Sequence, residues 1–352
     1  MKKIAIIGCG AIGSYHLEHL TQFEDIELAG LCDLVLARAE AFARKAGGGK
    51  AFADYREMFD SVKPDAVFIC IPPNAHGVIE FEAIARGIHM FVEKPVSVDL
   101  ALAKRIGSAI EAAGLISAAG FQCRYDNINP PAQAFVADNP VVTIQASRVG
   151  GVYAGPDWWR VRSASGGMLM DAGIHQMDMM RYLLGVEPAQ VFSFRRGGFV
   201  TNDECVGYDI DDVSVSAIRF QDGTTAVMTA GCYSVNGASW DSKMTFGARD
   251  CRMEYELCRK VSLFGVEPEA PAAEAETIKG DGTQRRSDNE RGTVVRSEVD
   301  FGLLCDRAFA DAVITGDPSA IRSPYADAVK SLAFVLACNK SMETGMPVEV
   351  DM

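Results

Sequence analysis

The sequence lacks the features that mark several classes of protein. No stretch approaches the roughly 18 consecutive apolar residues of a membrane-spanning helix. The ten cysteines include no C-x-x-C pair, which argues against a zinc ribbon or a thioredoxin-like redox motif. Lysine and arginine number 34 against 47 acidic residues, giving a net charge of -13. We therefore expect no metal, nucleic-acid or membrane partner, and we interpret the cysteines as small buried hydrophobes.

We expect no signal peptide at the N-terminus. Met1 and two lysines precede an apolar run that stops at Gly8, and no small-residue cleavage site follows. The 352 residues are 48% hydrophobic and 23% charged, the balance of a globular protein. This length exceeds what one hydrophobic core usually organises. We expect a soluble, cytoplasmic protein with two domains.

Short apolar runs alternate with helical patterns over the first part of the chain. The predicted strands are 3–7, 26–31, 66–71, 88–92 and 115–119, and the predicted helices are 11–20, 34–45, 75–86 and 100–113. Strands that alternate with helices of this length predict a parallel, doubly wound sheet that is buried on both faces. We place this α/β domain at residues 1–121.

The pattern changes after residue 121. Longer strands are predicted at 141–149, 191–199, 213–220 and 224–232, and helices at 301–315 and 325–344. A Gln-Asp-Gly turn joins the last two strands as a hairpin. Residues 122–352 are therefore predicted to form an α+β domain with a large, mainly antiparallel, open sheet and helices on one face. The other face of the sheet must also be covered, and self-association into a homodimer or homotetramer would cover it.

One stretch of the second half, residues 267–296, is poor in apolar residues and rich in Pro, Glu, Gly and Arg. We interpret it as a solvated loop or an insertion and assign it no role.

Three glycines between the first strand and the first helix form a G-x-G-x-x-G pattern. Gly8 permits a tight turn, Gly10 lets the backbone approach a pyrophosphate, and Gly13 lets the helix pack on the sheet. The helix N-terminus adds partial positive charge for the phosphates. The pattern predicts a dinucleotide-binding Rossmann domain, in which Ala11 and Ile12 also lie at the cofactor.

Asp33 lies 20 residues after Gly13, at the end of the second predicted strand. A carboxylate there accepts hydrogen bonds from both ribose hydroxyls of the adenosine half. Because a 2′-phosphate would be repelled by Asp33, and Leu34 is no phosphate-binding residue, we predict NAD rather than NADP. Arg38, one helical turn further on, either softens this preference or lies on an exposed helix face.

Three further motifs occur at the positions where such a domain places its ligands. They are IPPNAH at residues 71–76, EKP at residues 93–95 and SGGMLMDAGIHQMD at residues 165–178. Together they closely resemble the Gfo/Idh/MocA oxidoreductases over nearly the whole chain, less so after about Met244. One departure is Ser165, where a first glycine is common. The resemblance implies further cofactor-binding residues, namely Ile71, Pro72, Asn74, His76, Glu93 and Lys94.

Asp171 and His175 are four residues apart, so on a helix they share a face, with Asp178 about one turn further along. Methionines and leucines surround these polar residues, which therefore need a reason to be there. The resemblance implies that His175 accepts the proton of a substrate hydroxyl, that Asp171 flanks the hydroxyl, and that Lys94 hydrogen-bonds the reacting oxygen. Such an enzyme is an NAD(P)-dependent dehydrogenase that acts on a CH–OH group of a sugar, inositol or related polyol.

Several other residues match positions where family members line the substrate or nicotinamide pocket. They are Arg124, Tyr125, Asn127, Trp159, Arg160 and Asp178. An aromatic face against a sugar ring and an arginine fork toward hydroxyls suit a polyol. Plain packing or surface roles are the alternative for all of them except Asp178.

Two other functions compete with a dehydrogenase. Some relatives are NAD-dependent glycoside hydrolases that retain the cofactor and act through transient oxidation at C3. This fold also occurs in a non-catalytic NAD sensor, but a sensor has no need of Lys94, Asp171 and His175. Stoichiometric NAD turnover distinguishes the dehydrogenase from the hydrolase, which recycles its cofactor.

Overall fold

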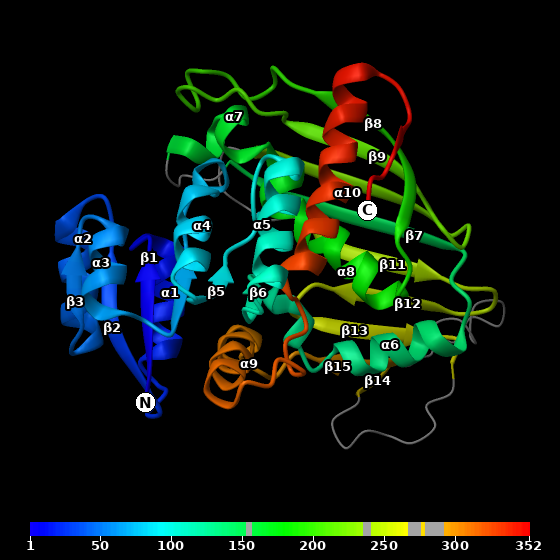
Figure 1. The fold of residues 1–352 in the computed structure, drawn as a ribbon. Helices are drawn as coiled ribbons and strands as arrows, with labels where there is room; N and C mark the ends of the chain where they lie inside the picture. Colours follow the sequence, from blue (N-terminus) through cyan, green and yellow to red (C-terminus); the bar gives the residue numbers. More distant parts are fainter. Residues whose placement is uncertain (153–156, 235–240, 267–275, 279–291) are drawn as a thin grey trace. The chain divides into compact units, whose positions relative to one another are not determined.

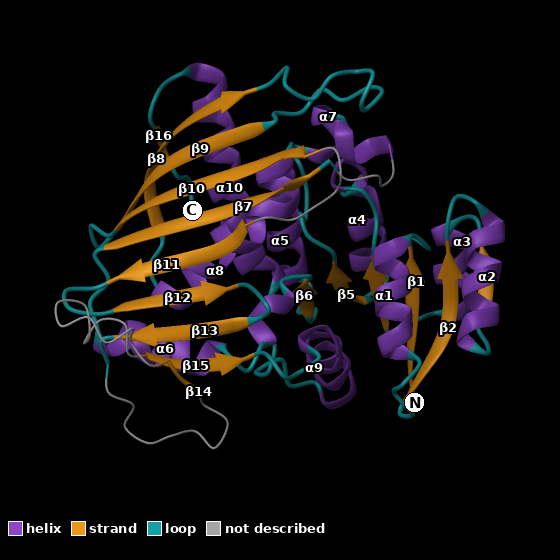
Figure 2. Ribbon diagram, turned by 180° about the vertical axis from the view of Figure 1, so that it is seen from behind, coloured by secondary structure: helices purple, strands orange, loops and turns teal. Residues whose placement is uncertain are grey.

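The computed structural model describes residues 1–352 except 153–156, 235–240, 267–275 and 279–291 (Figure 1). The described residues contain two β-sheets, each with helices packed on it (Figures 1 and 2). None of the described helices has both the length and the hydropathy needed to cross a bilayer. All ten cysteines are free thiols, and seven of them are buried.

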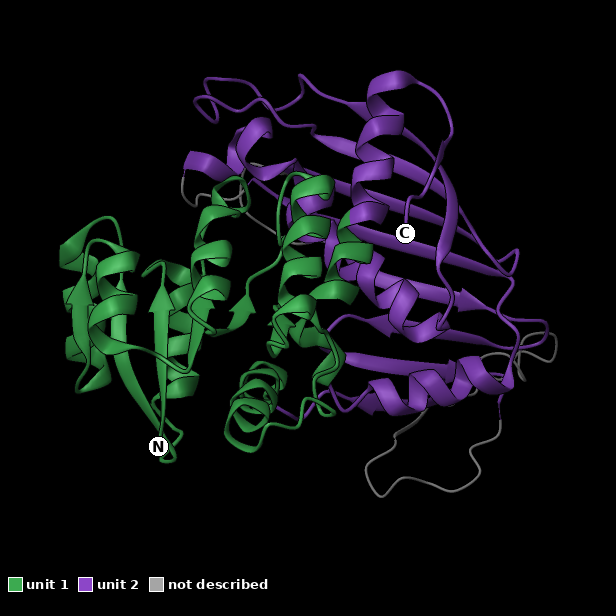
Figure 3. Ribbon diagram, in the orientation of Figure 1, with its two compact units in different colours: residues 1–125, 300–332 green, residues 126–299, 333–352 purple. Residues whose placement is uncertain are grey.

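The chain divides into two compact units that are not consecutive stretches (Figure 3). The first unit is Met1–Tyr125 with Asp300–Leu332, and the second is Asp126–Val299 with Ala333–Met352. The boundary expected after residue 121 leaves residues 300–332 in the second domain, whereas their contacts lie in the first unit. Ser323, for example, exchanges two hydrogen bonds with Ala119, of 2.7 and 2.8 Å.

The sheet of the first unit is parallel, with strand order β3-β2-β1-β4-β5-β6. Its strands are β1 (Lys2–Ile7), β2 (Ile26–Cys32), β3 (Lys50–Phe52), β4 (Ala66–Ile69), β5 (His89–Val92) and β6 (Ser117–Ala119). Strand β4 is buried along its whole length, as expected for a strand covered on both faces. The Rossmann prediction is confirmed. Sequence periodicity misses β3, because three residues are too few to show a pattern.

The helices of the first unit follow the strands in alternation. They are α1 (Ala11–Leu20), α2 (Leu36–Ala46), α3 (Tyr55–Val62), α4 (Val78–Ala85), α5 (Leu100–Ala112) and α9 (Phe301–Thr315), with short 3₁₀ turns η1 (Pro73–Ala75) and η2 (Gln122–Tyr125). Helix α3 is not among the predicted elements. Helix α9 completes the core, since Phe309 packs edge-on against the stacked rings of Phe68 and Phe91.

The second unit contains a mixed, mainly antiparallel sheet, as predicted. Its order over the described strands is β14-β15-β13-β12-β11-β7-β10-β9-β8-β16. The strands are β7 (Thr143–Gly151), β8 (Pro188–Arg196), β9 (Val213–Phe220), β10 (Thr225–Ser234), β11 (Asp241–Gly247), β12 (Arg252–Glu256), β13 (Lys260–Phe264), β14 (Glu276–Ile278), β15 (Gly292–Arg296) and β16 (Val348–Glu349). Neighbours pair antiparallel except β7 and β10, which pair in parallel.

Helices cover one face of this sheet (Figures 1 and 2). They are α6 (Asn129–Asp138), α8 (Ile174–Leu184) and the second-unit part of α10 (Tyr325–Thr344), and the unit also contains α7 (Arg162–Ser165) and two short turns, η3 (Asp157–Arg160) and η4 (Leu169–Gly173). Strand β9 alternates between buried and exposed residues. Phe220, on its buried side, contacts Phe334 of α10. Phe194, Val215 and Val227 are exposed.

The interpretation of residues 267–296 as a loop is wrong for part of the stretch. Residues 292–296 form strand β15, which pairs antiparallel with β13 over its whole length. A five-residue strand whose only apolar side chains are two adjacent valines is hard to distinguish from a loop until its partner is known. Residues 267–275 and 279–291 lie outside the described residues.

Candidate active site

The predicted cofactor residues lie along one edge of the parallel sheet. Asp33 follows β2, Gly8 follows β1, Ile71 follows β4 and Lys94 follows β5, and these four strands are consecutive neighbours. The chain order reverses between β1 and β4, which is where ligands bind outside the carboxyl ends of such strands. Three strand spacings of about 4.8 Å separate β2 from β5, about 14 Å in all. An edge of this length suits an extended dinucleotide.

The glycine turn has the shape expected of a dinucleotide-binding turn. Gly8 has φ +93°, and a Cβ atom there would lie 2.0 Å from the carbonyl oxygen of Cys70. A Cβ atom on Gly13 would lie 2.0 Å from the carbonyl oxygen of Gly8. Gly10 instead faces open space, with no atom within 4 Å of the position of a Cβ. It begins α1 without a side-chain cap, so the first amides of the helix can serve an anion. Ala11 and Ile12 are exposed beside it.

The carboxylate of Asp33 is held in place by the backbone. Its Oδ2 accepts a hydrogen bond of 2.9 Å from the Cys9 amide, and its Oδ1 accepts one of 2.8 Å from the Val35 amide. Each oxygen retains a second lone pair for a ribose hydroxyl. The guanidinium of Arg38 is 63% exposed and 3.9 Å from Oδ1, so solvent screens its charge.

His76 belongs to a buried pair with Glu80. Its Nδ1 lies 2.6 Å from Glu80 Oε1, and Glu80 Oε2 accepts a 2.6 Å hydrogen bond from the Gly77 amide. Burial raises the pKa of Glu80, but the charge of His76 and these hydrogen bonds outweigh it, and the net pKa is lowered. Within the described part of the chain, the buried His76 Nε2 has no hydrogen-bond partner. A cofactor hydroxyl or amide would satisfy this nitrogen.

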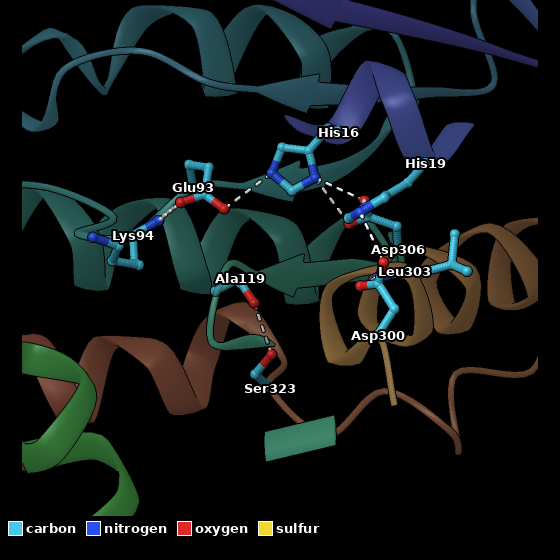
Figure 4. A network of polar contacts seen from close by, with 9 residues as sticks. All are labelled: His16, His19, Glu93, Lys94, Ala119, Asp300, Leu303, Asp306 and Ser323. Carbon is cyan, nitrogen blue, oxygen red and sulfur yellow. Dashed lines mark hydrogen bonds and ion pairs between the residues drawn. The ribbon is translucent and has the colours of Figure 1, made fainter. Parts of the chain in front are cut away.

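The other residues of the same motif precede this pair. Ile71 and Pro72 are half-buried and Asn74 is exposed at the end of β4. At the end of β5, Glu93 is buried and Lys94 half-buried. The backbone amide of Lys94 donates a 3.1 Å hydrogen bond to Glu93 Oε2 (Figure 4).

In the second unit, two glycines begin the segment that carries the predicted acid and base. Gly166 and Gly167 have φ of +78° and +92°, a left-handed backbone that glycine adopts without strain. The turn η4 that follows is π-helical and continues directly into α8. Asp171 lies in η4 and His175 in the first turn of α8, and both are half-buried. Such π-helical turns are frequent at functional sites.

A tryptophan orients Asp171. The indole Nε1 of Trp159 donates a 2.7 Å hydrogen bond to Asp171 Oδ2. Trp159 is 5% exposed and lies in a cluster with Met168, Ile210 and Cys232. Its ring is therefore packed against apolar side chains of the second unit, and its polar edge is directed to the carboxylate. From the sequence we expect the ring of Trp159 to lie against a sugar, and its hydrogen bond to Asp171 is not predicted.

Asp178 and Arg160 have other partners. Asp178 is 1% exposed, with the Arg181 guanidinium 3.8 Å away. That guanidinium also binds both carboxylate oxygens of Glu187, at 2.6 and 2.8 Å. Arg160 forms an ion pair with Asp157. Asp178 is thus one turn beyond His175, as expected, but in the interior of the unit.

Arg124 and Tyr125 lie in the first unit and are buried. Arg124 donates a 2.7 Å hydrogen bond to the carbonyl oxygen of Arg322 and forms an ion pair of 2.6 Å with Asp327. The hydroxyl of Tyr125 accepts a hydrogen bond from the Arg322 amide. Both side chains therefore hold residues 300–332 to the Rossmann sheet. Asn127 belongs to the second unit, where its amide donates a 2.8 Å bond to the Arg296 carbonyl oxygen.

Two family profiles match the chain. Residues 2–121 match a profile described as an oxidoreductase family with an NAD-binding Rossmann fold. Residues 140–251 match a profile described as a GFO/IDH/MocA C-terminal domain.

Individual relatives act on different polyols. The chain is 31% identical over 252 residues to a myo-inositol 2-dehydrogenase of Thermotoga maritima, covering 70% of this chain and 73% of the relative. It is 28% identical over 238 residues to a D-glucoside 3-dehydrogenase of Escherichia coli, covering 63% and 67%. A crystal structure of scyllo-inositol dehydrogenase from Lactobacillus casei, with bound NAD(H) and scyllo-inositol, superposes with a TM-score of 0.77 at 19% identity over 99% of both chains. At that identity the likeness establishes the fold.

Proposed function

This chain belongs to the Gfo/Idh/MocA oxidoreductase family, and from that premise we propose that it is an NAD-dependent dehydrogenase. Its substrate is a secondary alcohol of a sugar, inositol or related polyol. Relatives named for inositols and for a glucoside support this substrate class. The observation that carries the proposal is the hydrogen bond from Trp159 to Asp171, because it orients a carboxylate four residues from a histidine on the family's motif helix.

The cofactor we propose is NAD, held by the turn at Gly8 and Gly10 and by Asp33. NAD supplies the hydride acceptor when it is bound. The fixed carboxylate of Asp33 favours a ribose with two free hydroxyls, because a 2′-phosphate would bring negative charge against it. The exposure of Arg38 supports the view that this arginine offsets little of that repulsion.

His175 is the proposed base. An imidazole can take a proton from a hydroxyl and release it to solvent. Asp171, held by Trp159, stabilises the imidazolium that forms. The ammonium of Lys94 stabilises negative charge that develops on the substrate oxygen.

Fewer of the expected substrate-binding residues contact the substrate in this proposal. Trp159 serves by holding Asp171 and not as a platform for the sugar. The partners of Arg124 and Tyr125 support a role in packing residues 300–332. Arg160, which is half-buried, stays a candidate for contacts with substrate hydroxyls. The interior position of Asp178 beside Arg181 supports a packing role for that carboxylate.

A panel of inositols, aldoses and glycosides, followed by NADH formation and by mass spectrometry, tests the function. We expect NADH to form in proportion to an oxidised product that has lost two hydrogens. A glycoside cleaved to its sugar and its aglycone without net NADH formation would instead identify the hydrolase. NAD binding without turnover of any compound in the panel would contradict the proposal and favour the sensor.

We also propose that the chain assembles as a homodimer or homotetramer through the open face of the large sheet. Three apolar side chains on neighbouring strands of that face support this: Phe194 on β8, Val215 on β9 and Val227 on β10. Phe194 pairs directly with Val215 across the two strands. A second copy would remove this apolar surface from water.

A further inference from the structure

A buried histidine bridges two carboxylates inside the Rossmann unit (Figure 4). His16 lies on α1, and its Nδ1 is 2.9 Å from each carboxylate oxygen of Asp306 on α9. Its Nε2 is 3.1 Å from Glu93 Oε1. The exposed fractions of His16, Glu93 and Asp306 are 2%, 7% and 0%. We call these three residues the His16 bridge.

The geometry of the His16 bridge sets the charge of the ring. Ionised carboxylates only accept hydrogen bonds, so both ring nitrogens must carry a proton. Burial opposes this positive charge, but the charges and hydrogen bonds of Asp306 and Glu93 outweigh it and raise the pKa of His16 to about 10. The two carboxylates thus favour the imidazolium form of His16 at neutral pH.

A tyrosine hydroxyl and two thiols around the carboxylates do not supply that charge. Burial, together with the carboxylates, raises the pKa of the Tyr15 hydroxyl and of the Cys70 and Cys305 thiols. These three groups are therefore neutral at neutral pH. His19 contacts Asp306 as well, with its Nδ1 2.7 Å from Oδ2, and its Nε2 is 3.7 Å from Asp300.

The His16 bridge continues to Lys94 through Glu93. The Oε2 of Glu93 accepts the hydrogen bond from the Lys94 amide, while its Oε1 faces His16. The carboxylate also packs closely on Gly120, where a Cβ atom would lie 2.1 Å from Oε1. Glu93 is thus confined on three sides, and its Oε2 holds the backbone amide of Lys94.

We propose that His16 is a positioning residue for Lys94, acting as a fixed cation that clamps Glu93 while Asp306 holds the ring from α9. The role of Lys94 in this inference rests on the proposed function. A neutral side chain at position 16 leaves two buried carboxylates without their shared cation, so Glu93 moves and carries the Lys94 peptide with it.

A metal ion is the alternative occupant of this cluster, because two imidazoles and a carboxylate are zinc ligands. Two ligands on a tetrahedral zinc ion with bonds of 2.0–2.1 Å lie about 3.3 Å apart. The nitrogen-to-oxygen separations of 2.7 and 2.9 Å between the histidines and Asp306 are shorter and match hydrogen bonds. Stoichiometric zinc in the purified protein, lost in a His19→Gln variant, would overturn the hydrogen-bonded assignment.

The first experiment compares His16→Gln with His19→Gln in the full chain. Both changes remove an imidazole of α1 that contacts Asp306, but only His16 also contacts Glu93. We expect His16→Gln to lower kcat about tenfold with KM for NAD within about threefold, and His19→Gln to stay within about twofold of wild type. Equal losses of kcat in the two variants would show that α1 and α9 merely need to stay packed.

A double variant tests whether His16 acts through Glu93. Glu93→Gln alone should lower kcat as His16→Gln does, and the pair together should lose little more than either alone. Fully multiplicative losses would contradict the proposed route. If His16→Gln does not fold, Glu93→Gln still tests the link, because it removes the charge at the other end of the contact.

The second experiment needs no activity. The chain has five histidines, so NMR of ring nitrogens after ¹⁵N-histidine labelling resolves them individually, with His16 assigned from the variants. We expect the His16 ring to carry two protons at pH 8. A neutral ring there would overturn the inference even in an active enzyme. A doubly protonated ring in a protein that turns over no polyol would instead contradict only the proposed function.

Discussion

Replacing Trp159 by phenylalanine removes the indole N–H that holds Asp171 and keeps an aromatic ring in the cluster around it. The lost contact is a 2.7 Å hydrogen bond to a carboxylate that is half-buried. Hydrogen bonds to charged groups contribute about 1.5–3 kcal/mol. Because Asp171 is partly exposed, water replaces some of the lost bond, and we take the lower end of that range.

A loss of about 1.5 kcal/mol in the orientation of Asp171 corresponds to about a tenfold fall in kcat. The reason is that a free carboxylate samples rotamers that no longer stabilise the imidazolium at His175. NAD binding is expected to change little, since Asp33 and the glycine turn lie in the other unit. The measurement is steady-state NADH formation with whichever polyol the panel identifies.

Two controls separate orientation from packing. Trp158 is a half-buried neighbour in the same cluster, and Trp158→Phe makes the same chemical change without touching the Asp171 contact. Asp171→Asn keeps an oxygen that accepts the indole N–H but removes the charge. We expect Trp158→Phe to retain most activity and Asp171→Asn to lose at least as much as Trp159→Phe. A folded Trp159→Phe enzyme with more than half the wild-type kcat would refute the orienting role.

Three further predictions concern the cofactor, the chemistry and the assembly. Catalytic efficiency with NAD should exceed that with NADP by at least about tenfold, or about 1.4 kcal/mol; Asp33→Ser should narrow the difference, and equal efficiency in the wild type would contradict the assignment. Lys94→Ala and His175→Ala should each lower kcat by about 100-fold or more while NAD still binds by calorimetry, with a more graded loss for changes at Asp171. A His175→Ala enzyme with most of its turnover intact would exclude that residue as the base. Light scattering at micromolar concentration should report a dimer or tetramer that Phe194→Asp dissociates, and a wild-type monomer would argue against the open face as an interface.

Local sequence patterns predict much of the first unit because its elements depend on short-range physics. Gly8 is required because the chain turns there with positive φ, close to the carbonyl oxygen of Cys70. A run of apolar residues such as β4 is stable only in a sheet that is covered on both faces. Helix α10 begins and ends where its periodicity predicts, at Tyr325 and Thr344. Sequence patterns do not predict the strand at 292–296, because its pairing with β13 and not its own pattern makes it a strand.

The sequence by itself therefore determined the Rossmann domain, its glycine turn and the motif helix with Asp171 and His175, since backbone conformation and hydrophobic period are local properties. The tertiary structure alone decided which polar groups meet. His16 and Asp306 are 290 residues apart in the chain, and nothing in either neighbourhood indicates the other. The sequence likewise suggests that Arg124 binds a ligand, whereas in the structure its guanidinium contacts Arg322 and Asp327. A buried charge must find a partner to offset its desolvation, but any carboxylate satisfies that need, so only the packing of distant segments selects the one that does.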